Sequence, residues 1–345
     1  MSRPARTVFL GSGSFAVPIL ETLAEHPAVG LVGVVTSPPR PVGRAGKVTP
    51  SPVGASAGAM ALLVLTPQRL RDAEAVKAIE RLEPELIVLA DYGRIVPRAL
   101  LDRPRYGALN LHPSLLPRHR GATPIPAAIL SGDRRTGVSL MRMDEGLDTG
   151  PLIALREVPL AGDETAPELE AVLAKVAANL LASSLPAWLA GGSPLVAQPD
   201  HGASLTRPLR RGDGRLDPAL PAYLLERQVR AYQPWPGSFL ETDQGRLIVW
   251  QSRVLDVLGG QVGGATTQAA SAAAHHDPLA AHHDPLAAAP GTLVRAGEGL
   301  ALVALEGLLE LVEVQPEGGR RMRASVAIRG RPRLVGSRVR EVAVG

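Results

Sequence analysis

The sequence contains no cysteine among its 345 residues. This absence excludes a disulfide-stabilised scaffold, a thiol nucleophile and a thiolate metal site, and it fits a cytoplasmic protein. No uninterrupted apolar run reaches the roughly 18 residues that a membrane-spanning helix needs. The first residues, MSRPARTVFLGSG, also lack the apolar region and the cleavage site of a signal peptide. We therefore expect a cytoplasmic protein without a membrane span.

Lysine is scarce, with three residues, so 34 of the 37 basic residues are arginine. Acidic residues are missing from two basic stretches. Residues 36–50 carry Arg40, Arg44 and Lys47, and residues 320–340 carry eight arginines, without any Asp or Glu. Such stretches are typical of surfaces that meet a polyanion such as nucleic acid. The alternative is a solvated surface in a chain with biased amino-acid usage.

The length of the chain corresponds to about two domains. In the first half, continuous Val/Ile/Leu segments alternate with segments of helical spacing. This alternation predicts a doubly wound α/β domain, in which helices cover both faces of a mostly parallel sheet. We place this domain at residues 1–190. Its expected strands are 7–11, 31–36, 61–65, 85–90, 107–112, 137–143 and 152–158, and its expected helices are 14–26, 68–82 and 164–190.

Residues 191–209 are rich in Gly, Pro and Ser and have no periodicity, which predicts a linker. Residues 210–345 then form the second domain, which begins with a helix at 218–231 that Asp217 is well placed to cap. One helix followed by several short strands predicts a small β-barrel domain. The expected strands are 237–242, 246–256, 291–296, 300–305 and 308–315.

An insertion at residues 257–290 interrupts the second domain. It repeats the sequence AHHDPLA in tandem, at 274–280 and 281–287. A perfect short repeat among Ala, Gly and Gln residues predicts a flexible loop. Its four histidines and two aspartates could bind a metal ion, but no expected strand or helix fixes their geometry, so we expect adventitious binding at most.

Gly11 and Gly13 follow the first expected strand in the pattern G-x-G-x-x-A, which is typical of dinucleotide-binding turns. A site for NAD would need an acidic residue at the end of the second strand, and the sequence has none there. Arg40 could instead meet the extra phosphate of NADP, so an NADP-dependent oxidoreductase is one alternative. The interpretation that we prefer is a tight strand-to-helix turn that needs small residues.

The densest polar cluster, Asn110-Leu-His112-Pro-Ser114, leaves the end of the fifth expected strand. Residues two apart on a strand point to the same side, and parallel sheets bind ligands beyond the carboxyl ends of their strands. An amide and an imidazole that converge there can polarise a carbonyl group or bind an oxyanion. The alternative is that Asn110 and His112 are structural residues of a turn.

A second polar cluster lies in the loop 144–150, where Gly146 and Gly150 alternate with Asp148. The glycines indicate irregular backbone with close approaches. A carboxylate held beside a histidine can orient it, raise its basicity or accept a proton. The alternative is that Asp148 only caps the loop.

Five separated motifs form a combination that coincidence does not explain. They are the basic loop at 40–52, Asn110-x-His112 followed by Ser-Leu-Leu-Pro, the segment RHRGATPI at 118–125, the segment MDEGLDTG at 143–150 and the segment RAYQPWPGSF at 230–239. Together they resemble the formyltransferase family that uses 10-formyltetrahydrofolate. The resemblance extends over about residues 7–335 outside the insertion, and the motif at 230–239 resembles the start of the family's OB-like C-terminal domain.

The resemblance is closest to members of the family that act on tRNA. It implies a monomeric enzyme without a metal, which transfers the formyl group of 10-formyltetrahydrofolate to the α-amino group of methionyl-initiator tRNA for translation initiation. Asn110 and a protonated His112 would bind the oxyanion, and Asp148 would keep His112 charged and manage proton transfer. The implied folate-binding residues are Ser114, Leu115, Leu116, Pro117, Tyr92 and Gly93, and the implied tRNA-binding residues are Arg40, Arg44 and Lys47.

Two positions depart from the family pattern. Asp91 stands where the family usually has a small residue, and His119 stands where it usually has an aromatic one. A catalytically idle RNA-binding protein on the same fold would also account for the motifs, as would a relative that formylates a glycinamide ribonucleotide or an amino sugar. The basic stretch 36–50 favours a tRNA substrate over these small amines.

Overall fold

The computed structural model describes residues 3–42, 46–255 and 288–340. The chain divides into two compact units, Met1–Pro208 and Leu209–Gly345, and the division falls inside the predicted linker. Arg44 and both copies of the AHHDPLA repeat lie outside the described residues.

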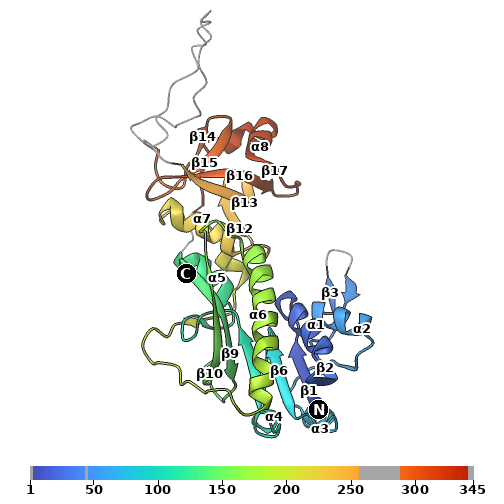
Figure 1. Ribbon diagram of the computed structural model, residues 1–345. Helices are drawn as coiled ribbons and strands as arrows, with labels where there is room; N and C mark the ends of the chain where they lie inside the picture. The colour runs from blue at the N-terminus through green and yellow to red at the C-terminus, as the bar shows by residue number, and fades with distance from the viewer. Residues whose placement is uncertain (1–2, 43–45, 256–287, 341–345) are drawn as a thin grey trace, which may run out of the picture. The chain divides into compact units, whose positions relative to one another are not determined.

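A seven-stranded sheet forms the centre of the first unit (Figure 1). Its order is β10-β9-β7-β6-β1-β2-β5, in which β7 through β5 run parallel and β9 runs antiparallel to both of its neighbours, β7 and β10. This confirms the mostly parallel, doubly wound α/β fold. The strands are β1 (Ala5–Gly11), β2 (Val29–Val35), β5 (Val64–Leu65), β6 (Leu86–Ala90), β7 (Ala108–His112), β9 (Arg135–Arg142) and β10 (Leu152–Pro159).

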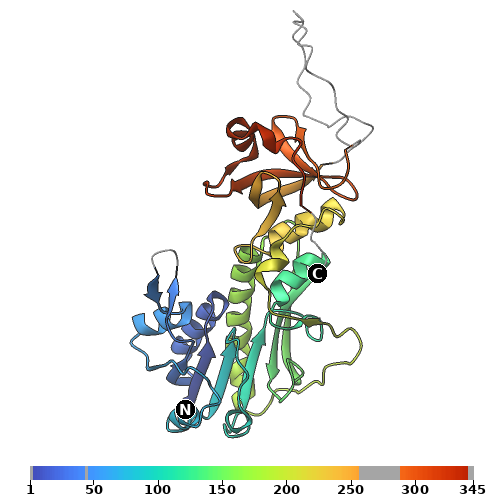
Figure 2. The same cartoon turned by 180° about the vertical axis from the view of Figure 1, so that it is seen from behind.

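Helices cover both faces of this sheet because its strands carry apolar residues on both sides. On one face, Val8 and Ile87 pack in a core cluster with residues of α3 and α4. On the other face lie α1 and α6, and α6 stands in front of the sheet in Figure 1 and behind it in Figure 2. The helices of this unit are η1 (Ser14–Ala16), α1 (Val17–Glu25), α2 (Pro52–Ala59), α3 (Ala73–Glu80), α4 (Arg98–Asp102), α5 (Pro124–Ser131) and α6 (Ala166–Leu189).

The long helix α6 begins where the sequence places a capping box. The Glu168 carboxylate accepts hydrogen bonds from the Thr165 backbone nitrogen at 2.9 Å and from the Thr165 hydroxyl at 2.7 Å. By length and composition α6 could also cross a membrane, as buried helices of soluble proteins often could. Its buried face, which includes Leu173, Ala177 and Leu181, packs with α1, β9 and β10, so we assign α6 to the core of this unit.

Residues 191–208 belong to the first unit and do not form the free linker that the sequence predicts. Val196 pairs with Leu152 at the start of β10. Farther on, β11 (Leu205–Thr206) pairs in parallel with β8 (Arg120–Gly121). Side-chain hydrogen bonds and short bridges hold this segment, and neither leaves a periodic pattern in the sequence.

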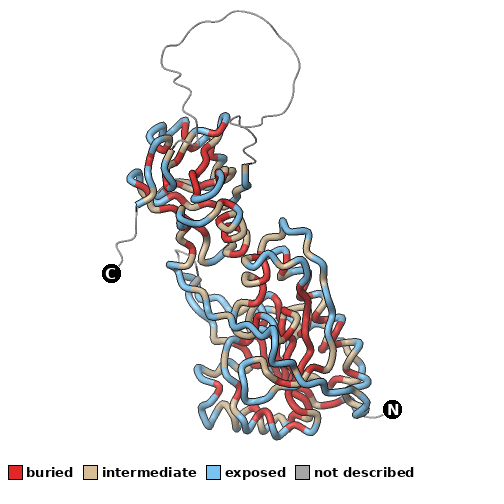
Figure 3. The backbone as a smooth tube through the Cα atoms, turned by 90° about the vertical axis from the view of Figure 1, so that its left-hand side faces the viewer, coloured by how far each residue is buried: buried red, intermediate tan, exposed pale blue. Residues whose placement is uncertain are grey.

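An antiparallel sheet forms the second unit, with the order β12-β13-β16-β15-β14 and β17 paired to β16. Its two edges are linked by the chain end, because Val339 pairs with Thr242 of β12 and Arg338 pairs with Thr292 just before β14. This gives the sheet a barrel-like course around a buried core of Leu and Val residues (Figure 3). The strands are β12 (Ser238–Thr242), β13 (Gly245–Leu255), β14 (Leu293–Ala296), β15 (Gly299–Val303), β16 (Leu308–Pro316) and β17 (Met322–Arg323).

The first long helix of this unit begins later than predicted. It is α7 (Ala222–Ala231), and Pro221 stands at its N-cap. The ring of Pro221 disfavours helical backbone at Leu220, so a helix that starts at 218 cannot continue through this point. Asp217 instead closes a turn, since its carboxylate accepts a hydrogen bond from the Ala219 backbone nitrogen at 3.0 Å.

Both basic stretches have regular structure that the sequence did not predict. The first forms a hairpin of β3 (Arg40–Val42) and β4 (Lys47–Thr49), on which Arg40 and Lys47 are exposed. The second includes α8 (Ala324–Gly330), which buries Ala324, Ala327 and Ile328 in the core of the second unit. All eight arginines between 320 and 340 are exposed, so this stretch packs one side into the fold and presents its charge to solvent.

Candidate active site

Strand β7 carries Asn110 and His112 to the carboxyl edge of the sheet. Asn110 pairs with Leu89 of β6 and with Met141 of β9, so it lies between two strands of the sheet. Both side chains are buried, with 6% of Asn110 and 5% of His112 exposed. They lie two residues apart on the strand and share one of its faces.

Asp148 joins these two residues from the loop after β9. Its Oδ1 accepts a hydrogen bond of 3.3 Å from the Asn110 side-chain nitrogen, and its Oδ2 lies 3.6 Å from His112 Nδ1. The Gly121 backbone nitrogen donates to Oδ2 at 2.8 Å. Asp148 has a φ of +54°, in the left-handed region that residues other than glycine seldom adopt. The structure therefore brings the three predicted catalytic residues together at one point.

The surroundings of His112 act on its pKa in opposite directions. Its Nε2 donates to the His119 carbonyl oxygen at 2.8 Å, because a carbonyl can only accept. Burial lowers the pKa of His112, and the Asp148 carboxylate and the His119 carbonyl offset only part of this effect. In the neutral ring, the nitrogen that faces Asp148, Nδ1, carries no proton, because Nε2 donates to the His119 carbonyl. The direction of this shift favours the neutral ring, because lost solvation outweighs the nearby carboxylate.

The segment after β7 forms a tightly bonded turn. The Ser114 hydroxyl donates to the Arg118 carbonyl at 2.6 Å, and the Ser139 hydroxyl joins Ser114 and Leu116 by accepting from Leu116 N at 3.0 Å and donating to Ser114 O at 2.6 Å. The side chains of Ser114 and Leu116 are buried. Leu115 and Pro117 are partly exposed, so they are the members of this segment whose side chains a ligand can reach.

Tyr92 and Gly93 lie just beyond β6. Tyr92 is 3% exposed and packs in the core cluster with Val8 and Ile87. Burial also raises the pKa of the Tyr92 hydroxyl. Gly93 is exposed and has a φ of +70°, so its backbone is the part of this pair that a ligand can approach.

Asp91 fills the space beside the glycine turn that follows β1. The backbone nitrogens of Ser12 and Gly13 donate to the Asp91 carbonyl, at 2.9 and 3.4 Å. A Cβ atom on Gly13 would lie 1.7 Å from Asp91 Oδ2, so a larger residue at position 13 would displace the Asp91 side chain. Loss of solvation, together with the nearby carboxylate of Glu170, raises the pKa of Asp91 to about 6. A dinucleotide pyrophosphate would need these backbone donors and would meet this carboxylate, which opposes the NADP alternative.

His119 contacts His112 through its backbone carbonyl, and its own position is held by polar contacts. It has a φ of +56°, and its ring Nε2 donates to the Asp133 carboxylate at 2.8 Å. Its backbone nitrogen donates to the Ser204 hydroxyl at 2.8 Å. These contacts fix the carbonyl that accepts the hydrogen bond from His112 Nε2, and the contact with Asp133 requires a side chain at position 119 that can donate.

The polar residues of the segment 196–206 were not predicted from the sequence. The side chain of Gln198 bonds to the loop of Asp148, Ser204 bonds to His119, and the Thr206 hydroxyl accepts from Thr123 N at 3.0 Å. Each of these contacts joins residues that are far apart in the chain. A Gly/Pro/Ser-rich composition does not distinguish such a segment from a free linker.

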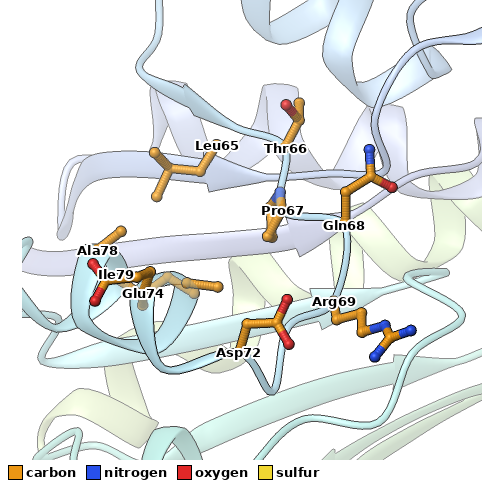
Figure 4. Close-up of a pocket in the computed structure, with 10 residues that line it drawn as sticks. Leu65, Thr66, Pro67, Gln68, Arg69, Asp72, Glu74, Ala78 and Ile79 are labelled. Atoms are coloured by element: carbon orange, nitrogen blue, oxygen red, sulfur yellow. The ribbon is translucent and has the colours of Figure 1, made fainter.

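Two concave regions of the first unit lie near the ends of its elements. One cavity of about 420 Å³ lies where Leu65 to Arg69 leave β5 and face the start of α3, and none of the predicted site residues lines it (Figure 4). The other cavity, of about 430 Å³, is lined by residues that include Arg118, His119 and Ser204. It therefore lies beside His119, whose carbonyl accepts a hydrogen bond from His112. Within the described ranges, no three His, Asp or Glu side chains are grouped as metal ligands.

The arrangement of a buried amide, an imidazole and a carboxylate on a doubly wound sheet agrees with sequence comparison. Residues 5–185 match the family described as formyl transferase, and residues 208–332 match its C-terminal domain. The chain therefore belongs to the formyl transferase family.

Relatives similar over nearly their full length are methionyl-tRNA formyltransferases. The chain is 42% identical to that of Halorhodospira halophila over 96% of this chain and 97% of the relative. It is 40% identical to that of Myxococcus xanthus, with 98% of each chain covered, and 39% identical to that of Thermus thermophilus, over 98% and 100%.

Solved structures show the same fold at low sequence identity. HypX from Aquifex aeolicus, in complex with tetrahydrofolic acid, has a TM-score of 0.57 and 15% identity over 94% of this chain and 47% of that chain. An N-formyltransferase from Helicobacter canadensis, in complex with folinic acid and dTDP-3-aminofucose, has a TM-score of 0.59 and 15% identity over 92% and 100%.

Proposed function

We propose that this protein transfers the formyl group of 10-formyltetrahydrofolate to the α-amino group of methionyl-initiator tRNA, giving formylmethionyl-tRNA for translation initiation. The observation that carries the proposal is the meeting of Asn110, His112 and Asp148 at the carboxyl edge of the sheet. The full-length identity of about 40% to methionyl-tRNA formyltransferases supports the choice of substrate.

The reaction begins when the neutral amine attacks the formyl carbon and forms a new C–N bond. The carbonyl oxygen then becomes an oxyanion. The Asn110 amide has two hydrogens, one of which binds Asp148, so the second is free to donate to the oxyanion. The oxyanion re-forms the carbonyl as the bond to N10 of the folate breaks.

One proton must leave the attacking amine, and one must reach N10 of tetrahydrofolate. Neutral His112 accepts a proton at Nδ1, and the Asp148 carboxylate 3.6 Å away stabilises the resulting imidazolium. His112 then passes this proton to N10, directly or through water, so the residues end the cycle unchanged. This sequence needs a neutral histidine at the start, in agreement with the lowered pKa of His112.

Folate and tRNA would bind on different parts of the protein. For folate we propose the segment Ser114, Leu115, Leu116 and Pro117 with Tyr92 and Gly93, where Leu115, Pro117 and the backbone of Gly93 are the accessible groups. For tRNA we propose the basic hairpin with Arg40, Arg44 and Lys47, together with the exposed arginines of 320–340. Double-helical RNA is read largely through its backbone and shape, which suits arginine-rich surfaces.

We further propose that the protein acts as a monomer in the cytoplasm. Its substrate is a tRNA used in translation, and the single chain contains both the catalytic cluster and the basic stretches.

Formyl transfer to charged initiator tRNA tests the proposal directly. Glycinamide ribonucleotide and a nucleotide-linked amino sugar serve as competing acceptors, and uncharged tRNA serves as the control. We expect formylation of the charged tRNA alone. Transfer to a small amine in preference to the tRNA would contradict the proposed substrate, and RNA binding without any transfer would favour an idle RNA-binding protein.

A further inference from the structure

The side chain of Gln198 uses all of its hydrogen-bonding capacity between two loops of the candidate site. Its Nε2 donates to the carbonyl oxygens of Asp148 and Gly150, both at 2.8 Å. Its Oε1 accepts from Arg120, at 3.1 Å from Nε and 2.8 Å from the terminal nitrogen. Two donors and two acceptor sites are thus filled, and the amide is fixed in one orientation.

The two bonds from Nε2 hold the backbone of the loop that carries Asp148. Asp148 adopts a left-handed conformation, with a φ of +54°, although it carries a side chain. In this conformation its carboxylate reaches both Asn110 and the Gly121 backbone nitrogen. Bonds to the carbonyls of Asp148 and Gly150 restrain the loop on either side of Thr149.

The two bonds that Gln198 accepts from Arg120 connect this loop to the backbone that holds His112. Arg120 lies between His119, whose carbonyl accepts from His112, and Gly121, whose nitrogen donates to Asp148. The backbone of Arg120 is itself held, since its nitrogen donates to Ser204 O at 2.9 Å. Gln198 and Arg120 therefore connect the two loops whose relative placement sets the distance between His112 and Asp148.

We propose that Gln198 is a positioning residue for formyl transfer, which sets the angle of the Asp148 carboxylate toward Asn110 and His112. The inference rests on the proposed function, because formyl transfer is the reaction whose geometry Gln198 would set. Gln198 touches neither substrate in this role, so it should affect turnover more than binding.

Three variants of the full-length protein separate the contributions of Gln198. Gln198→Met keeps the volume but removes all four bonds. Gln198→Glu keeps the acceptor for Arg120 and replaces the donor with an oxygen that opposes two carbonyls. Gln198→Ala removes both the donor and the acceptor. We expect kcat for formyl transfer to fall about 10- to 100-fold in all three, with the KM for the folate within about twofold, because small misplacements of reacting groups are costly. Asp200→Asn, at an exposed position in the same segment, is the matched control with wild-type kinetics.

A double-mutant cycle distinguishes positioning from a general loss of structure. If Gln198 acts through the Asp148 carboxylate, Gln198→Ala should cause little further loss of kcat in an Asp148→Asn background. Multiplicative losses would overturn the proposal, and so would a Gln198→Met variant with wild-type kcat. Rescue of kcat by Gln198→Glu would show that only the contact with Arg120 matters, which also overturns it.

Amide hydrogen exchange tests the inference independently of activity. The Gly121 N–H donates to the Asp148 carboxylate, so it should exchange faster in the Gln198→Ala and Gln198→Glu proteins than in the Asp200→Asn control. Unchanged exchange at Gly121 would refute the positioning role even if kcat fell. If the wild-type protein formylates no tRNA while the exchange rate at Gly121 rises in the variants, the proposed function is wrong. The conclusion that Gln198 holds the loop of Asp148 then still stands.

Discussion

The amide nitrogen of Asn110 carries two hydrogens, and Asp148 uses one of them. Asn110→Ala should therefore remove the donor to the oxyanion and lower the rate of formyl transfer by roughly 100- to 1,000-fold. Folate affinity should change little, because the accessible groups proposed for folate lie on Leu115, Pro117 and Gly93. Single-turnover kinetics and equilibrium binding of folate measure the two effects separately.

The size of the effect decides the role of Asn110. A variant that keeps near-wild-type turnover removes Asn110 from the mechanism, whereas a parallel loss of folate affinity would make it a binding residue. Thermal unfolding provides the control, because Asn110 is buried and its loss must be shown to leave the fold intact.

Asp91 gives a prediction for the dependence of stability on pH. Its pKa rises from 3.8 in its ordinary state to about 6 in the folded protein, through lost solvation and the carboxylate of Glu170. Between these values the folded state binds more protons than the unfolded state, so the free energy of unfolding falls as pH rises through this window. Asp91→Asn keeps the shape, suits the left-handed backbone and removes the charge.

We expect Asp91→Asn to be more stable than the wild type above pH 6, with an advantage that grows between about pH 4 and 6 and is then constant. Urea unfolding at pH 4, 5, 6 and 7.5 measures it, and Asp200→Asn controls for the loss of a carboxylate elsewhere. An advantage that does not change with pH would mean that the substitution acts through packing alone.

At the level of strands and helices, the elements that depend on burial were predictable. Runs such as Leu86–Ala90 are apolar on both faces because helices cover both sides of the sheet, and this leaves a clear sequence signal. The hairpin at Arg40–Thr49 leaves no such signal, because its exposed strands need neither apolar alternation nor burial. The predicted start of this helix at 218 is wrong, because Pro221 disfavours helical backbone at the residue before it, and α7 begins at Ala222.

The candidate site also contains residues that the sequence predicts and residues that it does not. Asn110 and His112 could be predicted because the period of a strand places them on one face. The left-handed Asp148 and its partner Gln198 are 50 residues apart, and only the folded chain brings them together. The segment of Gln198 has the composition of a linker, since its role depends on single side chains and not on a repeated pattern.

The hairpin carries a prediction about tRNA. Replacing Arg40, Arg44 and Lys47 with Ala should flatten the slope of log affinity for tRNA against log salt by up to about two to three units, since each lost phosphate contact removes about 0.7–0.9. Affinity for folate should stay unchanged. Alanine at Arg69, Arg71 and Arg81, three exposed positions in the same unit, is the control of equal charge. Equal slopes in the two triple variants would make the hairpin an ordinary solvated surface.

Across the whole molecule, the boundary of the catalytic unit determines what a shortened chain can do. The contacts of Gln198, Ser204 and Thr206 with the site place the functional end of the first unit at Pro208, although composition alone suggested residue 190. A chain that ends at Pro208 keeps these contacts, and a chain that ends at Ala190 loses all of them.

We therefore expect the 1–208 chain to bind folate with wild-type affinity and the 1–190 chain to bind it at least about tenfold more weakly, because the loops around His112 and Asp148 lose their restraints. The 1–208 chain should still bind tRNA much more weakly than the full protein, since 16 of the 37 basic residues follow Pro208. Its salt slope for tRNA should be correspondingly smaller. Isothermal titration of folate and filter binding of tRNA at several salt concentrations measure both effects, and circular dichroism verifies that each chain is folded. Equal folate affinity in two folded chains would show that residues 191–208 do not shape the folate site. An unchanged salt slope in the 1–208 chain would remove the arginines of the second unit from tRNA binding.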